Sequence, residues 1–191
     1  MSNYNKNSKQ TYYQSTEFGL NGRRFGTDIK KRLDGFKFLL DNVKGKSVLD
    51  IGCAEGLISL EFAKAGASLI HGFDLQDISI KHANLIFSDS EINTEYKFKQ
   101  FDFNYPNKLK EIPHLLDSYD IVLFLGIYHH LKLPQAKSIL DKTFQLSKEY
   151  VVVRTDAILP NSKLSDNFKL VKKVPGNNKI PTGKLNIFKR V

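Results

Sequence analysis

The sequence predicts an α/β fold in which a mostly parallel β-sheet carries helices on both faces. Short apolar segments alternate with segments of helical periodicity along most of the chain, which is the pattern of successive β-α-β units. A glycine-containing turn joins the first apolar segment to the helical segment that follows it. The last two apolar segments have no helix between them, so we expect an antiparallel hairpin at one edge of the sheet.

The N-terminal part has the least regular pattern. We expect residues 1–26 to form an arm or lid and residues 27–191 to form a single domain. A helix is predicted to begin at Thr27, because Thr27 and Asp28 can cap it, and to end at Gly45. Its apolar residues recur at helical spacing, namely Ile29, Leu33, Phe36 and Leu40.

Seven strands and three further helices are predicted beyond this point. The strands are expected at 47–51, 69–73, 96–101, 119–125, 150–154, 168–174 and 185–190. The helices are expected at 57–65, 78–87 and 134–146, the last with a proline at its start. Segment 119–125 is strongly apolar, so we place it at the centre of the sheet.

Charge is unevenly distributed along the chain, whose formal net charge is +9. Residues 1–47 hold ten basic residues against four acidic ones, residues 48–160 hold eleven against fifteen, and residues 161–191 hold eight against one. Two basic ends therefore flank a mildly acidic centre. The pattern indicates an anionic partner such as RNA, a phosphorylated metabolite or a membrane surface, or else a lysine-rich surface that serves solubility.

Composition excludes several classes of protein. Cys53 is the only cysteine, so neither an internal disulfide nor a cysteine-based zinc cluster can form. No apolar run approaches the ~20 residues of a membrane span. The polar residues 1–10 do not form a secretory signal. We therefore expect a cytoplasmic protein, and the sequence leaves its oligomeric state open.

The strongest motif is the segment from Val48 to Gly56, which reads VLDIGCAEG. A tight glycine turn between a strand and a helix lets backbone approach a ligand at the carboxyl end of the sheet. The dinucleotide fingerprint G-x-G-x-x-G fails here, because Ala54 and Leu57 stand where it needs glycines. A P-loop is excluded by the missing Gly-Lys-Ser/Thr.

This turn resembles motif I of the class I S-adenosylmethionine-dependent methyltransferases, whose fold is Rossmann-like. The matching residues are Asp50, Gly52, Cys53, Ala54, Glu55 and Gly56, with Ala54 in place of the middle glycine. The resemblance implies that the turn packs against the methionine portion of S-adenosylmethionine, with S-adenosylhomocysteine as the product. It further implies that Asp50 orients the ammonium group of the cofactor.

Two further carboxylates follow the next two predicted strands. Asp74, followed by Leu75, ends the second strand, where an acid can accept both ribose hydroxyls. Asp102, followed by Phe103, ends the third strand. In the family that acid bonds the adenine amino group and the apolar neighbour stacks on the ring. A single aspartate at a strand end is often only a turn or cap residue, but three after successive strands are far more specific.

The stretch from Leu125 to Leu131 reads LGIYHHL and follows the central strand. In the family this stretch lines the cleft between the cofactor and the acceptor, so we expect Leu125 to contact the cofactor and Tyr128 the acceptor. His129 or His130 is a candidate general base, unless it merely packs or caps the next helix. We expect no metal site, because adjacent side chains point apart and a third ligand is not evident.

The predicted arm supplies further candidates for acceptor binding, namely Tyr13, Arg23 and Arg24. An arginine there can pair with a carboxylate or phosphate. Residues 22–27 and 44–48 resemble the enzymes related to the tRNA wobble-uridine carboxymethyl-transferring group.

Three functions remain open, in order of preference. The first is methyl transfer to an oxygen or nitrogen of an unidentified small molecule. The second is modification of RNA, such as tRNA methyl or carboxymethyl transfer. The third is a non-catalytic regulator that binds the cofactor. An NAD-dependent oxidoreductase is a distant fourth. Covalent pyrimidine methylation is disfavoured because no cysteine follows the central strand.

Overall fold

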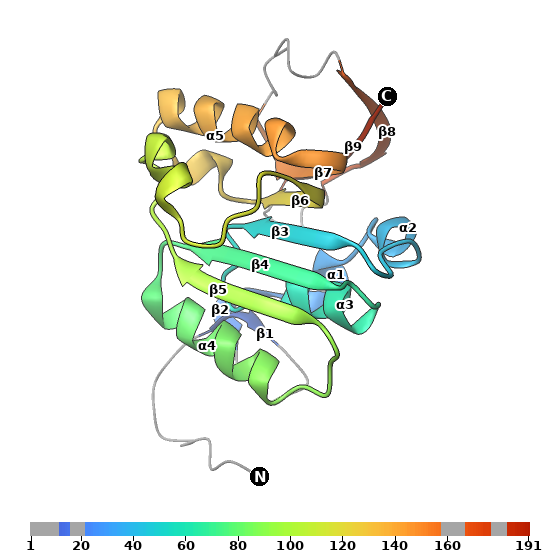
Figure 1. The fold of residues 1–191 in the computed structure, drawn as a ribbon, viewed down its shortest axis with the longest axis vertical. Helices are drawn as coiled ribbons and strands as arrows, with labels where there is room; N and C mark the ends of the chain where they lie inside the picture. Colours follow the sequence, from blue (N-terminus) through green and yellow to red (C-terminus); the bar gives the residue numbers. More distant parts are fainter. Residues whose placement is uncertain (1–11, 16–21, 158–166, 177–182) are drawn as a thin grey trace.

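The computed structural model describes residues 12–15, 22–157, 167–176 and 183–191. Seven strands form one sheet in the order β5-β4-β3-β6-β7-β9-β8 (Figure 1). Their bounds are β3 Ser47–Ile51, β4 Leu69–Asp74, β5 Glu95–Gln100, β6 Tyr119–Leu125, β7 Ser147–Thr155, β8 Phe168–Val174 and β9 Lys184–Arg190. Strands β3 to β7 pair in parallel, and β9 is antiparallel to both β7 and β8. The predicted fold class, the edge hairpin and the central place of β6 are confirmed.

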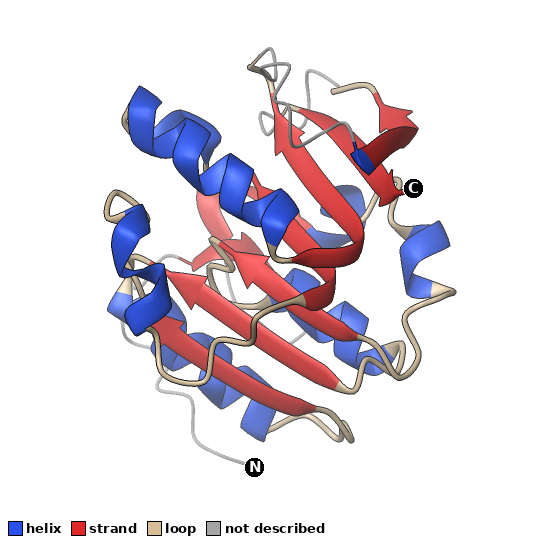
Figure 2. Cartoon of the chain, turned by 45° about the horizontal axis from the view of Figure 1, so that its top comes forward, coloured by secondary structure: helices blue, strands red, loops and turns tan. Residues whose placement is uncertain are grey.

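Helices cover both faces of this sheet (Figure 2). Helix α5 (Leu133–Gln145) and the 3₁₀ turn η1 (Pro106–Glu111) lie on one face, and α3 (Leu57–Lys64) and α4 (Asp77–Ser88) lie on the other. Neighbouring strand residues point to opposite faces, so Val48 packs in the α3–α4 core and Leu49 in the α5 core. Residues 121–125 of β6 are all apolar and buried between the two cores, which explains why this segment is a continuous hydrophobic run.

The predicted single helix from Thr27 to Gly45 is wrong. Strand β2 (Gly22–Asp28) includes Thr27 and Asp28, and two one-turn helices follow, α1 (Ile29–Arg32) and α2 (Lys37–Leu40). Gly35 separates them with φ +88°, and a Cβ there would lie 2.5 Å from Cγ2 of Val174. The chain therefore turns sharply against β8, although its apolar residues still face the core as their spacing predicted.

A second, smaller sheet precedes the main one. Strand β1 (Tyr12–Ser15) pairs in parallel with β2. Strand β2 crosses the boundary predicted at residue 26, and the role of residues 1–26 as an arm or lid stays a prediction.

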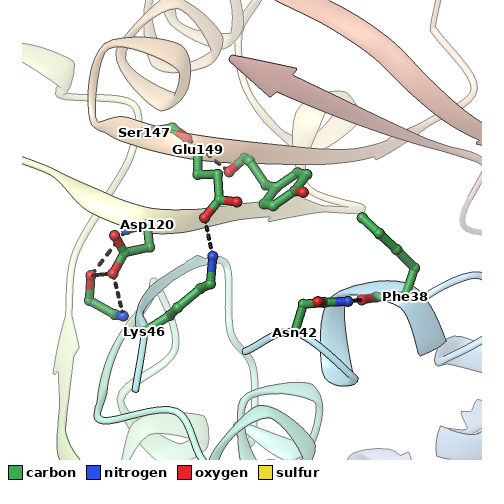
Figure 3. Close-up of polar contacts among 8 residues, drawn as sticks. Phe38, Asn42, Lys46, Asp120, Ser147 and Glu149 are labelled. Carbon is green, nitrogen blue, oxygen red and sulfur yellow. Dashed lines mark hydrogen bonds and ion pairs between the residues drawn. The ribbon is translucent and has the colours of Figure 1, made fainter. Parts of the chain in front are cut away.

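Polar contacts fix the amino ends of the central strands (Figure 3). Asp120 of β6 accepts hydrogen bonds from the backbone N–H and the hydroxyl of Ser47, at 2.8 and 2.7 Å. Lys46 forms an ion pair with Glu149 of β7. These contacts connect β3, β6 and β7 at the amino end of the sheet. The carboxyl ends of the strands lie at the opposite end. None of the helices in the described ranges is long and apolar enough to cross a membrane.

Candidate cofactor and acceptor site

The strand order reverses between β3 and β6. The chain proceeds from β3 outward to β4 and β5, then returns to β6 on the other side of β3. A crevice forms at such a switch point, outside the carboxyl ends of the strands. A cavity of about 390 Å³ lies there, and it brings together eight of the predicted site residues: Gly52, Ala54, Asp74, Leu75, Asp102, Phe103, Leu125 and His130. A larger cavity of about 700 Å³ lies between η1 and α5 and contains none of them.

Asp74 is held between two turns. Its Oδ2 accepts a hydrogen bond from the N–H of Ala54 and its Oδ1 accepts one from the N–H of Gln76, both at 2.9 Å. Ala54 adopts φ +48°, a left-handed conformation that a glycine would adopt without strain. Ala54 lines the cavity, and its backbone is held in this strained conformation.

Asp102 is fixed in a similar way after β5. Its Oδ1 accepts hydrogen bonds from the backbone N–H of Asn104 at 2.9 Å and from its side-chain amide at 3.0 Å. The side-chain Oδ1 of Asn104 in turn accepts a bond of 3.4 Å from the backbone N–H of Lys132. This chain of bonds connects the loops after β5 and β6 across the cavity.

Asp50 is buried, with 2% of its surface exposed. Its Oδ2 accepts a hydrogen bond of 2.6 Å from the Ser59 hydroxyl, whereas its Oδ1 has no partner among the described residues. Burial raises the pKa of Asp50 to about 6; Ser59 opposes the shift, Asp74 adds to it and Arg32 opposes it. A buried carboxylate oxygen without a donor is costly, so this site suits a ligand with a cationic donor.

Arg32 lines the cavity, and sequence reasoning missed it. The side chain is 4% exposed, and its backbone carbonyl accepts a 2.7 Å bond from the Arg154 guanidinium. Arg32 is the last residue of α1, and the prediction of one continuous helix did not place it at a helix end. Arg32 and Asp50 together offer a cation and an anion, which complement the carboxylate and ammonium of an amino acid.

Gly126 shapes the opposite wall of the cavity. It has φ +74°, and a Cβ placed on it would meet no atom within 4 Å. Its N–H donates to the carbonyl of Arg154 at 2.9 Å, which holds the turn after β6 to β7. The open space beside Gly126 allows a ligand to approach the backbone closely.

The two histidines lie in the 3₁₀ turn η2 (Tyr128–His130), and both are exposed. His130 lines the cavity and His129 does not. Their ring centroids are 4.0 Å apart, so the expectation that the side chains point apart is wrong. Burial lowers the pKa of His129, with a smaller contribution from His130 and an opposing one from Asp156. In the part of the chain that the structure describes, no group of three metal-ligating side chains is present.

The other predicted site residues lie outside the cavity wall. Tyr128 is buried and its ring packs edge-on against Phe124, with centroids 6.4 Å apart. Cys53 and Glu55 belong to the glycine turn but are buried, and Gly56 is the N-cap of α3. The side chains of Tyr13, Arg23 and Arg24 lie outside what the structure describes.

This strand order, with a switch-point cavity lined by strand-end carboxylates, is that of the class I, Rossmann-like methyltransferase fold. The chain belongs to the family described as methyltransferase domain, which matches residues 42–190.

Solved structures of methyltransferases share this fold. Magnesium protoporphyrin IX methyltransferase from Synechocystis PCC 6803, crystallised with S-adenosylmethionine, superposes with a TM-score of 0.67 at 18% identity and covers 85% of this chain and 80% of that one. The N-methyltransferase NodS from Bradyrhizobium japonicum, in complex with S-adenosylhomocysteine, gives 0.65 at 13% identity, with 84% and 86% covered.

Curated relatives are similar over part of their length. A tRNA U34 carboxymethyltransferase of Pseudomonas putida is 28% identical over 120 residues, which are 60% of this chain and 36% of the relative. A ubiquinone biosynthesis O-methyltransferase of Bordetella avium is 38% identical over 105 residues, 55% of this chain and 40% of the relative. The chain thus matches two-fifths or less of these relatives, which differ in their substrates.

Proposed function

We propose that this protein transfers a methyl group from S-adenosylmethionine to an oxygen or nitrogen of an acceptor. The observation that carries the proposal is a switch-point cavity lined by two strand-end carboxylates, Asp74 and Asp102, with a third, Asp50, buried behind the cavity wall and in electrostatic contact with Asp74. When bound, the sulfonium cofactor supplies an electrophilic methyl group, so the protein needs mainly to align the reactants and exclude water.

Each side of the cavity has residues suited to one part of the cofactor. Asp50 and Arg32 would hold the ammonium and carboxylate, and the carboxylate of Asp74 would accept the ribose hydroxyls. Asp102 and Phe103 would hold the adenine. Backbone and side chains of the turn and the strand ends would complete the site, namely Gly52, Cys53, Ala54, Glu55, Gly56, Leu75 and Leu125. The unpartnered Oδ1 of Asp50 supports this assignment, because a buried acceptor suits an ammonium donor.

His130 is the residue we assign to the acceptor side. Its imidazole lines the cavity next to Leu131, where it can take a proton from an acceptor hydroxyl or amine. His129 packs beside it without lining the cavity, and Tyr128 would support the turn from below. Tyr13, Arg23 and Arg24 in the proposed arm, residues 1–26, would close over the acceptor. The single cysteine is compatible with a cytoplasmic location.

Two acceptor classes have support. A small molecule fits a cavity of about 390 Å³ that has to hold the cofactor as well. RNA is favoured by the basic C-terminal hairpin described below, and some of the similar curated proteins are tRNA-modifying enzymes.

Calorimetric titration with S-adenosylmethionine and S-adenosylhomocysteine tests the cofactor site. We expect binding by the wild type and a loss of at least about tenfold in Asp74→Ala, because the ribose loses a charged acceptor. The control is Asp89→Ala, an exposed acid at the end of α4, which should bind as the wild type does. A folded wild-type protein that binds neither ligand would overturn the proposal.

A further inference from the structure

The β8–β9 hairpin carries an uncompensated positive charge. Its described residues, 167–176 and 183–191, include six basic residues and no acidic ones. Arg190 is used internally, because its guanidinium donates to the carbonyl of Ser147 at 2.6 Å and lies 4.6 Å from the centroid of the Phe168 ring. Five lysines remain, and none forms an ion pair with another described residue: Lys169, Lys172, Lys173, Lys184 and Lys189.

Three lysines on the helical surfaces have a carboxylate partner on their own helix or at its end. Lys37, Lys64 and Lys81 each contact a carboxylate three or four residues away, at 2.8, 3.0 and 2.6 Å. The hairpin therefore differs from these helical surfaces in having no carboxylate of its own. A lysine-rich surface that served solubility alone would not require this separation of charge.

Three of the hairpin lysines share one face. In the β8–β9 register Lys169 stands directly opposite Lys189, and Lys172 stands opposite Ile187, two residues earlier on the same face of β9. Like charges in directly opposed positions repel one another and destabilise a sheet. The ammonium of Lys189 also lies 5.6 Å from the centroid of the Tyr150 ring, and that of Lys46 lies 5.9 Å from it. A polyanion seated on this face would remove the repulsion.

The cavity-side end of the hairpin adjoins the acceptor side of the site. Lys184, the first residue of β9, pairs with Thr155 at the carboxyl end of β7. The next residue, Asp156, interacts electrostatically with His129. From this corner the hairpin extends along the outer edge of the sheet (Figure 1), a strand of seven residues or about 20 Å. Lys184 lies on the opposite face of β9 from Lys189, so a long anion that follows the lysines of the hairpin to this corner crosses the edge of the sheet and ends beside the histidines.

We propose that the β8–β9 hairpin binds the sugar–phosphate backbone of an RNA and so delivers a nucleotide to the acceptor side of the cavity. The delivery step rests on the proposed methyl transfer, whereas the binding step does not. Lysines aligned along a strand contact successive phosphates and provide affinity that is independent of sequence. A single phosphorylated metabolite would engage only one or two of the five lysines.

Fluorescence anisotropy with labelled single-stranded RNA and with unfractionated tRNA, over a salt series, tests the binding step. We expect wild-type affinity to fall steeply with salt. Lys169→Gln/Lys172→Gln/Lys189→Gln should bind about tenfold more weakly or worse, with a salt slope smaller by about two. The charge-matched control is Lys37→Gln/Lys64→Gln/Lys81→Gln, which should bind within about twofold of the wild type.

Two further measurements keep the test decisive. The variant Lys169→Arg/Lys172→Arg/Lys189→Arg keeps the charge and should keep the affinity, and cofactor titration shows whether each variant is folded. Equal losses in both glutamine variants, or wild-type binding that is indifferent to salt, would overturn the proposal. It would also be overturned if the hairpin variant lost affinity for phosphatidylglycerol vesicles but not for RNA. If the wild type binds RNA but not the cofactor, the proposed methyl transfer is contradicted and the proposed RNA binding is not.

Discussion

The two sides of the cavity differ in how firmly their side chains are held. On the β4–β5 side, backbone amides bind both oxygens of Asp74, and Asn104 fixes Asp102. On the β6 side, His129 and His130 are exposed and Gly126 leaves open space. The preorganised side suits a cofactor that is the same in every turnover. The exposed side suits an acceptor that brings its own contacts.

The largest effect is expected on the acceptor side. His130→Ala should lower the rate of methyl transfer about 100-fold at neutral pH, the lower range for loss of a general base, and leave cofactor affinity unchanged. His129→Ala is the matched control, because its ring lies beside His130 but not on the cavity wall. Transfer of tritiated methyl groups into metabolite extract and into tRNA measures both variants. If both variants lose the same methyl-transfer activity, the assignment of His130 rather than His129 as the general base is wrong.

On the cofactor side, Arg32→Gln should weaken S-adenosylmethionine binding about 10- to 100-fold, as expected for a lost charge-assisted bond of roughly 1.5–3 kcal/mol. Adenosine lacks the amino-acid portion, so its affinity for the variant should match that for the wild type. Calorimetry with the two ligands measures the difference. If adenosine binding is lost as well, Arg32 supports the fold rather than the methionine portion of the ligand.

Asp50→Asn should stabilise the cofactor-free protein while abolishing tight cofactor binding. The folded-state pKa of Asp50 is raised to about 6 from 3.8, so the native state binds a proton more tightly than the unfolded state. Wild-type stability therefore falls as pH rises from about 4 through 6, and the substitution removes that loss. We expect a gain of about 3 kcal/mol at pH 7 that vanishes near pH 4. Urea unfolding across this range checks it, and a variant less stable than the wild type at pH 7 would contradict it.

The smallest effect is expected at the turn itself. Ala54→Gly should stabilise the protein by up to about 1 kcal/mol, because it relieves a left-handed backbone conformation. Ala65→Gly, at φ −79°, has no such strain and should be neutral or destabilising. Thermal unfolding of the two variants makes the comparison, and equal shifts would show that Ala54 is not strained.

Patterns in the sequence were sufficient to predict the strands of the sheet and the carboxylates on the β4–β5 side of the cavity. Asp74 ends the apolar strand β4 and Asp102 lies two residues beyond the end of β5, and parallel strands bring their carboxyl ends to one edge. The N-terminal helices were not predictable in the same way, because the contact of Gly35 with Val174 joins residues far apart in the chain. Arg32 was missed for that reason. The close packing of His129 and His130 was missed because a 3₁₀ turn places neighbours closer in direction than a strand does.

The position of β9 inside the sheet has a consequence for how the protein is made. Strand β9 is the last of the seven in the chain, yet it lies between β7 and β8. Strand β8 is synthesised earlier but has no neighbour in the sheet until β9 arrives. During translation the edge of β7 that pairs with β9 therefore stays unpaired until β9 has been synthesised. An unpaired strand edge can pair with another chain, so the nascent chain is prone to aggregate in this interval.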